Sequence, residues 1–234
     1  MDKITFFTLF FFFLFGCLQI GGQTKVEEKN ICFFGKIDDG FNAIARGIPN
    51  ATIKWFDPDL FSPPEMEKCK IIVVKDDEKG RYADRLLRQK IRNAVWGGST
   101  LLVYKEAATL VRNDSSVLGW NLIIGEVIPC EIAPTAERKT FGERIVNGTL
   151  IITERDAATE GITSMAANEW AITEVSVKEG KQLAIIREGK LPSSPAVVAI
   201  LKANYGFGQT YYFAYNPLLT PGIVANIFFS VYAQ

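Results

Sequence analysis

Charged side chains gather directly after three apolar segments that we predict to be strands. The binding candidates among them are Asp38, Asp39, Asp76, Asp77, Lys105 and Glu106, and Lys75 lies beside the second pair. In a parallel α/β sheet, ligands bind outside the carboxyl ends of the strands, where these side chains would meet. Carboxylates gathered in this way could bind a divalent cation or form an acid/base pair for sugar chemistry. Alternatively, they are solvated loop residues and helix-start carboxylates, which the helix dipole favours.

The sequence contains no histidine. This removes the usual general base at neutral pH, the Ser-His-Asp and Cys-His arrangements, and the commonest metal ligand. Carboxylate or lysine chemistry, metal binding through oxygen ligands, and the absence of catalysis remain. The sequence therefore favours a protein without catalytic activity, and we assign no catalytic residue, no metal site and no cofactor.

Of the four cysteines, Cys32, Cys69 and Cys130 lie outside the apolar N-terminal segment, and no CxxC motif or metal-binding spacing joins them. Cys32 and Cys69 both stand where predicted strands begin. They could form a disulfide between neighbouring strands, or they could be small buried apolar residues.

Composition indicates one folded domain of ordinary polarity. Of the 234 residues, 48% are hydrophobic and 22% are charged, enough for a sizeable core. The 26 basic and 26 acidic residues cancel, so no global field favours nucleic acid. Residues 81–92 are locally basic, and we interpret them as the solvated face of a helix.

The N-terminal segment from Ile4 to Ile20 holds seventeen residues without a charge. We predict that residues 1–22 form a signal peptide or an N-terminal membrane anchor, with cleavage, lipidation and retention all open. Residues 23–30 read as a polar linker. Three glycosylation sequons, at Asn50, Asn113 and Asn147, agree with an extracytoplasmic location.

The first half of the folded region predicts a parallel sheet. Short apolar runs predict strands at 31–35, 51–56, 70–74 and 100–104, and apolar spacing predicts a helix over 79–96. The last two of these strands and the helix between them form a βαβ unit. Such a unit implies a parallel sheet with both faces covered.

The second half predicts strands joined by short turns. The expected strands are 128–132, 150–153, 170–177, 182–187, 196–201 and 210–215, and a helix follows at 222–232. Short connections favour antiparallel pairing at this edge. We therefore predict one three-layer α/β domain over residues 31–234, with a central, mostly parallel sheet and antiparallel C-terminal edge strands.

The Gly206-Phe207-Gly208 stretch precedes a predicted strand instead of following one, so it does not fit a dinucleotide-binding loop. We interpret it as a turn between strands, with Thr220 as the N-cap of the last helix. The aromatic residues nearby could form a sugar platform, or alternate ones could face the core. They are Tyr205, Phe207, Tyr211, Tyr212, Phe213 and Tyr215.

The chain end from Asn204 to Pro217 (NYGFGQTYYFAYNP) reads as glycines, an aromatic strand and Asn-Pro, and a helix follows. This order resembles the closing unit of class I glutamine amidotransferase-like domains. Asn93 to Tyr104 (NAVWGGSTLLVY) is similar to their step of helix, Gly-Gly and apolar strand. Gly148 to Ile162 (GTLIITERDAATEGI) resembles their strand and short loop. The resemblance covers roughly residues 30–232 and implies a flavodoxin-like α/β fold.

Enzymes of that superfamily carry a cysteine nucleophile on the turn after the strand that Leu101 to Tyr104 matches. Here the turn reads Lys105-Glu106-Ala107-Ala108, and the partner histidine is missing. The sequence is therefore closer to the non-catalytic relatives of gliding motility, intraflagellar transport and oligosaccharyltransferase complexes. Those relatives imply a binding or scaffolding role.

We thus expect an exported or membrane-anchored interaction domain that binds a partner protein or a glycan, and no nucleic acid. The alternative is an exported carbohydrate-active hydrolase that uses carboxylates, by analogy with trehalose-utilisation-type relatives of the same fold.

Overall fold

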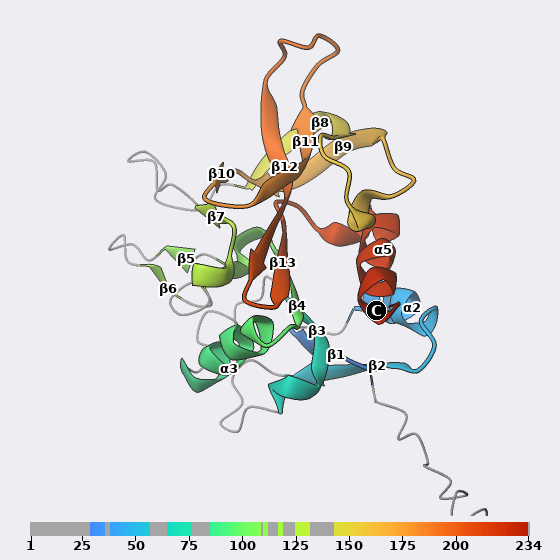
Figure 1. Cartoon of the computed structure of the whole chain (residues 1–234). Coiled ribbons are helices and arrows are strands. Elements are labelled where there is room, and N and C mark those ends of the chain that lie inside the picture. Colours follow the sequence, from blue (N-terminus) through green and yellow to red (C-terminus); the bar gives the residue numbers. More distant parts are fainter. Residues whose placement is uncertain are drawn as a thin grey trace, which may run out of the picture.

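A nine-stranded mixed sheet runs through the structure in the order β2-β1-β3-β4-β13-β12-β11-β8-β9 (Figure 1). The computed structural model describes residues 29–35, 38–56, 65–75, 85–108, 110–111, 117–118, 125–131 and 143–233. The predicted N-terminal segment 1–22 lies outside this range. Lys29 and Asn30, predicted as the end of the linker, belong to the first strand. None of the helices in these ranges is long and apolar enough to cross a membrane.

The parallel half of the sheet confirms the predicted α/β fold. Its strands are β1 (Lys29–Phe34), β2 (Ala51–Phe56), β3 (Cys69–Val74), β4 (Thr100–Tyr104) and β13 (Gly208–Phe213). β1 pairs with β2 and β3, β3 pairs with β4, and β4 pairs with β13, all in parallel. All five residues of β4 are buried. Continuous apolar runs are expected in such strands because helices cover both sheet faces.

Helices complete the three layers. α2 (Asp39–Arg46) and α5 (Pro221–Tyr232) pack on one face, and α3 (Arg85–Trp96) packs on the other (Figure 1). Phe41 of α2 lies 5.0 Å from the ring of Phe33 on β1, and both rings are fully buried. Burying one such side chain stabilises the fold by about 1.5–3 kcal/mol. The predicted helix 79–96 is described from Arg85 onward.

Antiparallel strands extend the sheet beyond β13, as predicted. They are β12 (Ala196–Tyr205), β11 (Lys181–Arg187), β8 (Glu143–Ile152) and β9 (Ser164–Thr173). β13 itself is antiparallel to β12 and parallel to β4, so it joins the two halves.

Several strand predictions in this half were wrong in extent. The predicted strands 150–153 and 196–201 belong to the longer β8 and β12. Residues 170–177 divide between β9, which ends at Thr173, and the short β10 (Ser176–Val177), because Thr173 pairs with β8 whereas Ser176 pairs with Glu131. The predicted strand 128–132 is reduced to β7 (Cys130–Glu131), which pairs with β10 outside the main sheet. A further short ladder joins β5 (Leu110–Val111) and β6 (Val117–Leu118). The 3-10 helices are η1 (Met66–Lys68), η3 (Lys105–Ala108), η4 (Gly125–Val127), η5 (Ala157–Thr159) and η6 (Pro217–Leu219).

Cys32 and Cys69 form a disulfide between the neighbouring strands β1 and β3. Their Cα atoms are 5.6 Å apart, and both residues are buried. The bond closes a loop of 37 residues. In the chain-entropy model, such a loop stabilises the fold by about 4 kcal/mol.

The Gly206-Phe207-Gly208 stretch is the turn of the β12–β13 hairpin, as predicted. Gly206 has a φ of 61°, which glycine adopts readily, and Phe207 N–H donates to the Trp96 carbonyl at 2.9 Å. A Cβ atom on Gly208 would overlap the carbonyl oxygens of Val95 and Ser99. Glycine is therefore required at position 208, because the turn lies directly on the corner between α3 and β4 and leaves no room for a side chain.

Thr220 occupies the N-cap position of α5 and Pro221 is its first residue, as predicted, but the Thr220 side chain makes no capping hydrogen bond to the helix. Its hydroxyl instead hydrogen-bonds to the Pro217 carbonyl at 3.1 Å and to the hydroxyl of Tyr215 at 2.9 Å. The reason is that Tyr215 is fully buried and its hydroxyl needs a partner.

The close approach of Gly208 predicts a large effect of one methyl group. Gly208→Ala should lower the free energy of unfolding by about 2–3 kcal/mol, because the strand must move away from the α3–β4 corner. The matched control is Gly222→Ala in α5, where a Cβ would make only an ordinary contact with Ile162. This control should leave stability unchanged or raise it by up to about 1 kcal/mol. Urea unfolding measures both, and a Gly208→Ala variant within about 0.5 kcal/mol of the parent would contradict the packing.

Candidate functional site

The carboxyl edge of the parallel strands carries the first predicted pair of carboxylates. Asp38 precedes α2, and its side chain accepts a hydrogen bond from the Gly40 N–H at 2.9 Å. Its second oxygen lies 3.4 Å from the Nζ atom of Lys75, which follows β3. Asp39 is the first residue of α2, where the helix dipole favours a negative charge. Asp38 thus caps a helix and pairs with a lysine.

The turn after β4 is a strained strand-to-helix corner. Lys105 has a φ of 51°, a conformation that few residues other than glycine adopt, and η3 begins there. Tyr212 of β13 donates its hydroxyl hydrogen to the Lys105 carbonyl at 3.2 Å. We call Lys105 and Glu106 the elbow. Strain of this kind costs about 1–3 kcal/mol and is concentrated at functional sites.

Other predicted members of this edge are only partly described. Asp76 and Asp77 lie outside the described residues, and so does the side chain of Glu106, although its backbone belongs to η3. Among the residues that the structure describes, no group of three or more Asp, Glu, Cys or His side chains could hold a metal ion. The structure therefore brings Asp38 and Lys75 together and places the elbow at the same end of the sheet.

The aromatic residues of the C-terminal hairpin divide between core and surface. Tyr211, Tyr212, Phe213 and Tyr215 are almost fully buried, which agrees with the core interpretation. Phe207 is 88% exposed at the hairpin turn. Tyr205 is half-buried, so Phe207 is the most exposed aromatic residue of the predicted set.

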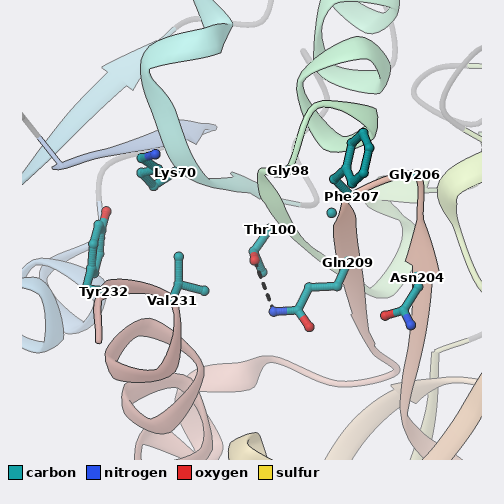
Figure 2. A pocket seen from close by; sticks show the side chains of 10 residues that line it. Lys70, Gly98, Thr100, Asn204, Gly206, Phe207, Gln209, Val231 and Tyr232 are labelled. Atoms are coloured by element: carbon teal, nitrogen blue, oxygen red, sulfur yellow. Dashed lines mark hydrogen bonds between the residues drawn. The ribbon is translucent and has the colours of Figure 1, made fainter. Parts of the chain in front are cut away.

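The opposite end of the parallel strands contains a groove that the sequence did not reveal. It has a volume of about 810 Å³, within the range of ligand sites, and lies between the sheet and the end of α5 (Figure 2). We call it the amino-edge groove. Its side chains come from β3, β4, the β12–β13 hairpin and α5, namely Lys70, Thr100, Asn204, Phe207, Gln209, Val231 and Tyr232.

The floor of the amino-edge groove is polar but carries almost no charge. Gln209 donates from Nε2 to the Thr100 hydroxyl oxygen at 3.2 Å, and Asn204 lies beside Gln209 on β12. Among the described residues that line the groove, Lys70 alone carries a formal charge. The groove thus presents amide and hydroxyl groups, which both donate and accept hydrogen bonds.

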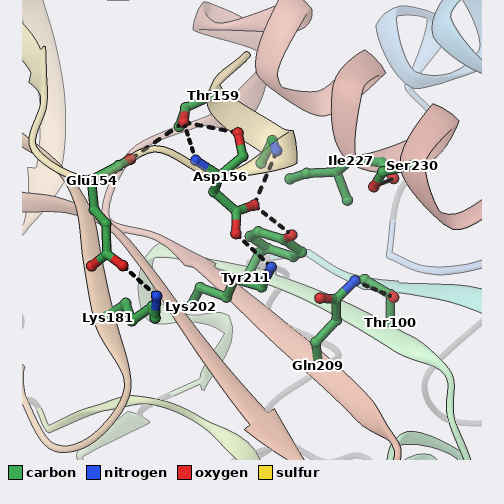
Figure 3. A network of polar contacts seen from close by, with 11 residues as sticks. Thr100, Glu154, Asp156, Thr159, Lys181, Lys202, Gln209, Tyr211, Ile227 and Ser230 are labelled. Carbon is green, nitrogen blue, oxygen red and sulfur yellow. Dashed lines mark hydrogen bonds and ion pairs between the residues drawn. The ribbon is translucent and has the colours of Figure 1, made fainter.

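A charged network continues the same sheet face behind the groove (Figure 3). Lys202 of β12 lies 2.6 Å from an oxygen of Asp156, and both side chains are largely buried. The other oxygen of Asp156 accepts hydrogen bonds from Tyr211 and from the Ala158 N–H, each at 3.0 Å. This network ties the loop between β8 and β9 to the central hairpin.

Burial and pairing oppose each other at Asp156. Burial raises the pKa of its carboxyl, but hydrogen bonds from Lys202, Ala158 and Tyr211, together with the charge of Lys202, outweigh this and hold the pKa below its ordinary value. The pKa of the Tyr211 hydroxyl is raised, first by burial and then by the charge of Asp156. Asp156 is therefore ionised and Tyr211 is protonated at neutral pH.

The groove could not be predicted from the sequence, because its lining residues come from four separate segments and form no recognisable motif. Asn204 and Gln209 flank the hairpin, but Thr100 precedes them by about a hundred residues. The usable signal was the alternation along the hairpin, which sets Asn204 and Gln209 on the same face as Lys202 and Tyr211.

No protein-family model matches this sequence, and neither does any curated protein sequence. Solved structures do resemble the fold. A cytoplasmic protein from Salmonella typhimurium LT2 aligns with a TM-score of 0.60 and 14% identity, over 86% of this chain and 99% of that one. A putative ThuA-like protein from Bacteroides uniformis aligns with a TM-score of 0.61 and 9% identity, over 88% and 91%.

A β-galactosidase from Bacillus circulans sp. alkalophilus also aligns, with a TM-score of 0.56 and 11% identity, over 86% of this chain. The match spans only 31% of the galactosidase chain. At these identities the likenesses show the fold alone. They agree with the α/β fold that the sequence predicted.

The network around Asp156 predicts a loss of stability when its cation is removed. Lys202→Met should lower the free energy of unfolding by about 1–3 kcal/mol, because a largely buried carboxylate is left without its partner. Lys181→Met is the matched control, because Lys181 pairs with Glu154 near the surface. That exposed pair should contribute less than about 1 kcal/mol. Equal losses in the two variants would contradict a special role for the Asp156 network.

The lowered pKa of Asp156 also predicts a pH dependence. Its stabilising contribution is complete above the pKa of an unfolded aspartate, about 3.9, and is lost as the pH falls through the lower folded value. Asp156→Asn should therefore flatten the stability profile below about pH 4. Denaturant unfolding between pH 7 and pH 2 measures this, and parallel profiles for the parent and the variant would refute it.

Proposed function

We propose that the chain is an exported, non-catalytic interaction domain that binds a partner protein or a glycan. The observation that carries this proposal is the elbow. Its strained backbone is the kind of corner on which a nucleophile is presented, yet it holds Lys105 and not a cysteine or serine. Without a histidine in the sequence, no imidazole can take a proton there.

The thiol chemistry of the described residues supports the same proposal. Cys32 and Cys69 are joined in a disulfide, so neither sulfur can act as a thiolate. Cys130 is buried, and burial raises the pKa of its thiol to about 12. A thiol with such a pKa is protonated and unreactive at neutral pH.

The hydrolase alternative requires two carboxyl groups that face one cleft. Asp38, the best-placed candidate at the carboxyl edge, is engaged by the Gly40 N–H and by Lys75. Its two oxygens therefore serve helix capping and ion pairing. This engagement favours binding over glycoside hydrolysis.

Export is supported by the apolar N-terminal sequence and by the two described sequons. Asn50 is exposed in the turn before β2 with a φ of 62°, which asparagine tolerates. Asn147 is exposed on β8, and its side-chain oxygen accepts a hydrogen bond from the Glu169 N–H at 2.8 Å. Exposure of both residues is compatible with glycan attachment.

A non-catalytic elbow predicts the absence of thiol-dependent turnover. The purified chain should hydrolyse neither glutamine nor p-nitrophenyl acetate above the buffer rate, and treatment with iodoacetamide should change nothing. Turnover that iodoacetamide abolishes would overturn the proposal.

Export predicts glycosylation of accessible sequons when the chain is produced in secretory eukaryotic cells. Removal of N-glycans with an amidase should increase electrophoretic mobility, and Thr52→Ala should remove the share that Asn50 carries. Thr52 is exposed, so this change leaves the Asn50 turn intact. If removal of N-glycans left the mobility of the secreted parent chain unchanged, no sequon would carry a glycan, and this would argue against an exported glycoprotein.

A further inference from the structure

We propose that the amino-edge groove binds a neutral oligosaccharide. The inference rests on the proposed binding function and deepens it, because it names the ligand class and moves the site away from the carboxyl edge. It is drawn from four features of the groove: its hydrogen-bonding row, its charge, its exposed aromatic rim and the pairing of its strands.

The hydrogen-bonding row crosses three neighbouring strands. Asn204 is in register with Gln209, and Gln209 is in register with Thr100. Neighbouring strands lie about 4.8 Å apart, so the row offers a polar group at each of three regular steps. Sugar hydroxyls both donate and accept, and amide and hydroxyl side chains match this because they do the same.

Two members of the row, Asn204 and Gln209, retain hydrogen-bonding capacity for a ligand. Gln209 uses its Nε2 group on Thr100, and no described residue donates to its side-chain oxygen. Asn204 is exposed, and its amide makes no hydrogen bond to the residues that the structure describes. Thr100 is 3% exposed and is fixed by the bond from Gln209. The row is therefore preorganised at one end and open at the other.

Charge in and around the groove favours a neutral ligand. Lys202, the cation nearest behind the floor on the same strand as Asn204, is neutralised by Asp156 at 2.6 Å. Among the described residues that line the groove, Lys70 alone carries a formal charge. A polyanion needs several cations in one place, and the described lining holds no such cluster.

The aromatic rim suits the apolar face of a sugar ring. Phe207 is 88% exposed, yet its backbone is held because its N–H donates to Trp96 and glycines flank it. An exposed ring on a rigid turn loses little conformational entropy on binding, so the C–H face of a pyranose can cover it favourably.

A peptide fits the same groove less well. Peptides commonly bind by adding a strand to a sheet edge or by anchoring apolar side chains in pockets. At the groove, the strands β4 and β13 are each paired on both sides, so their backbone groups are already used. The groove floor between them carries amides and hydroxyls where a peptide would need apolar anchor pockets.

The test uses the full chain in a detergent without a sugar headgroup. The probes are an array of immobilised neutral, sialylated and sulfated glycans, and an array of random decapeptides. The parent chain should bind neutral glycans. Titration with the strongest neutral oligosaccharide should then show at least tenfold weaker binding for Phe207→Ala and for Gln209→Leu. Leu191→Ala, which changes a residue 67% exposed in the loop at the far end of β12, should bind within twofold of the parent.

Thermal melting verifies that the variants are folded, and Phe207→Ala keeps the test decisive even if Gln209→Leu is unstable, because Phe207 packs little. Binding only to peptides or only to anionic glycans would overturn the inference, as would neutral-glycan binding that both groove variants retain. If ligand capture depends on Lys105 and not on the groove, the inference fails while the proposed binding function stands. Release of cleaved sugar from a bound glycan would instead refute the non-catalytic function.

Discussion

The pairing of β13 on both of its sides is the constraint on which the rest of the structure depends. β13 is parallel to β4 and antiparallel to β12, so it joins the two halves of the sheet and fixes every side chain along its length. Gln209 reaches the amino-edge groove, Tyr211 reaches Asp156, and Tyr212 reaches the elbow. A shift of one residue would reverse all of these contacts, because side chains alternate between the two faces of the sheet.

The same strand explains why the two ends of the sheet differ in character. At the carboxyl end, the Tyr212 hydroxyl donates to the carbonyl of Lys105, whose backbone is strained. At the amino end, Gly206 and Gly208 let the hairpin pack against the α3–β4 corner, and Phe207 between them is exposed to solvent. In this fold class ligand sites usually lie at the carboxyl ends of the strands, whereas the polar amino-edge groove lies at the opposite end.

The sequence predicted the parts of the fold in which local pattern and burial agree. The runs 51–56 and 100–104 coincide with β2 and β4, because continuous apolar residues bounded by turns leave few alternatives. The extent of β9 was mispredicted because its pairing with β8 decides it. Thr220 occupies the predicted N-cap position, but its hydroxyl bonds to the buried Tyr215 hydroxyl and not to the helix. The groove was beyond prediction, since Thr100 and Gln209 meet only through the parallel pairing of β4 and β13.

The central claim is that this chain binds its ligand at the amino-edge groove and performs no chemistry at the elbow. Hydrogen–deuterium exchange of the full chain, with and without a bound neutral oligosaccharide, tests it most directly. Amides around the hairpin turn, residues 204–209, and at the end of α5 should become protected, while the elbow remains unchanged. Protection confined to the elbow and to the turn that holds Asp38 would contradict the claim, because the ligand would then occupy the carboxyl edge.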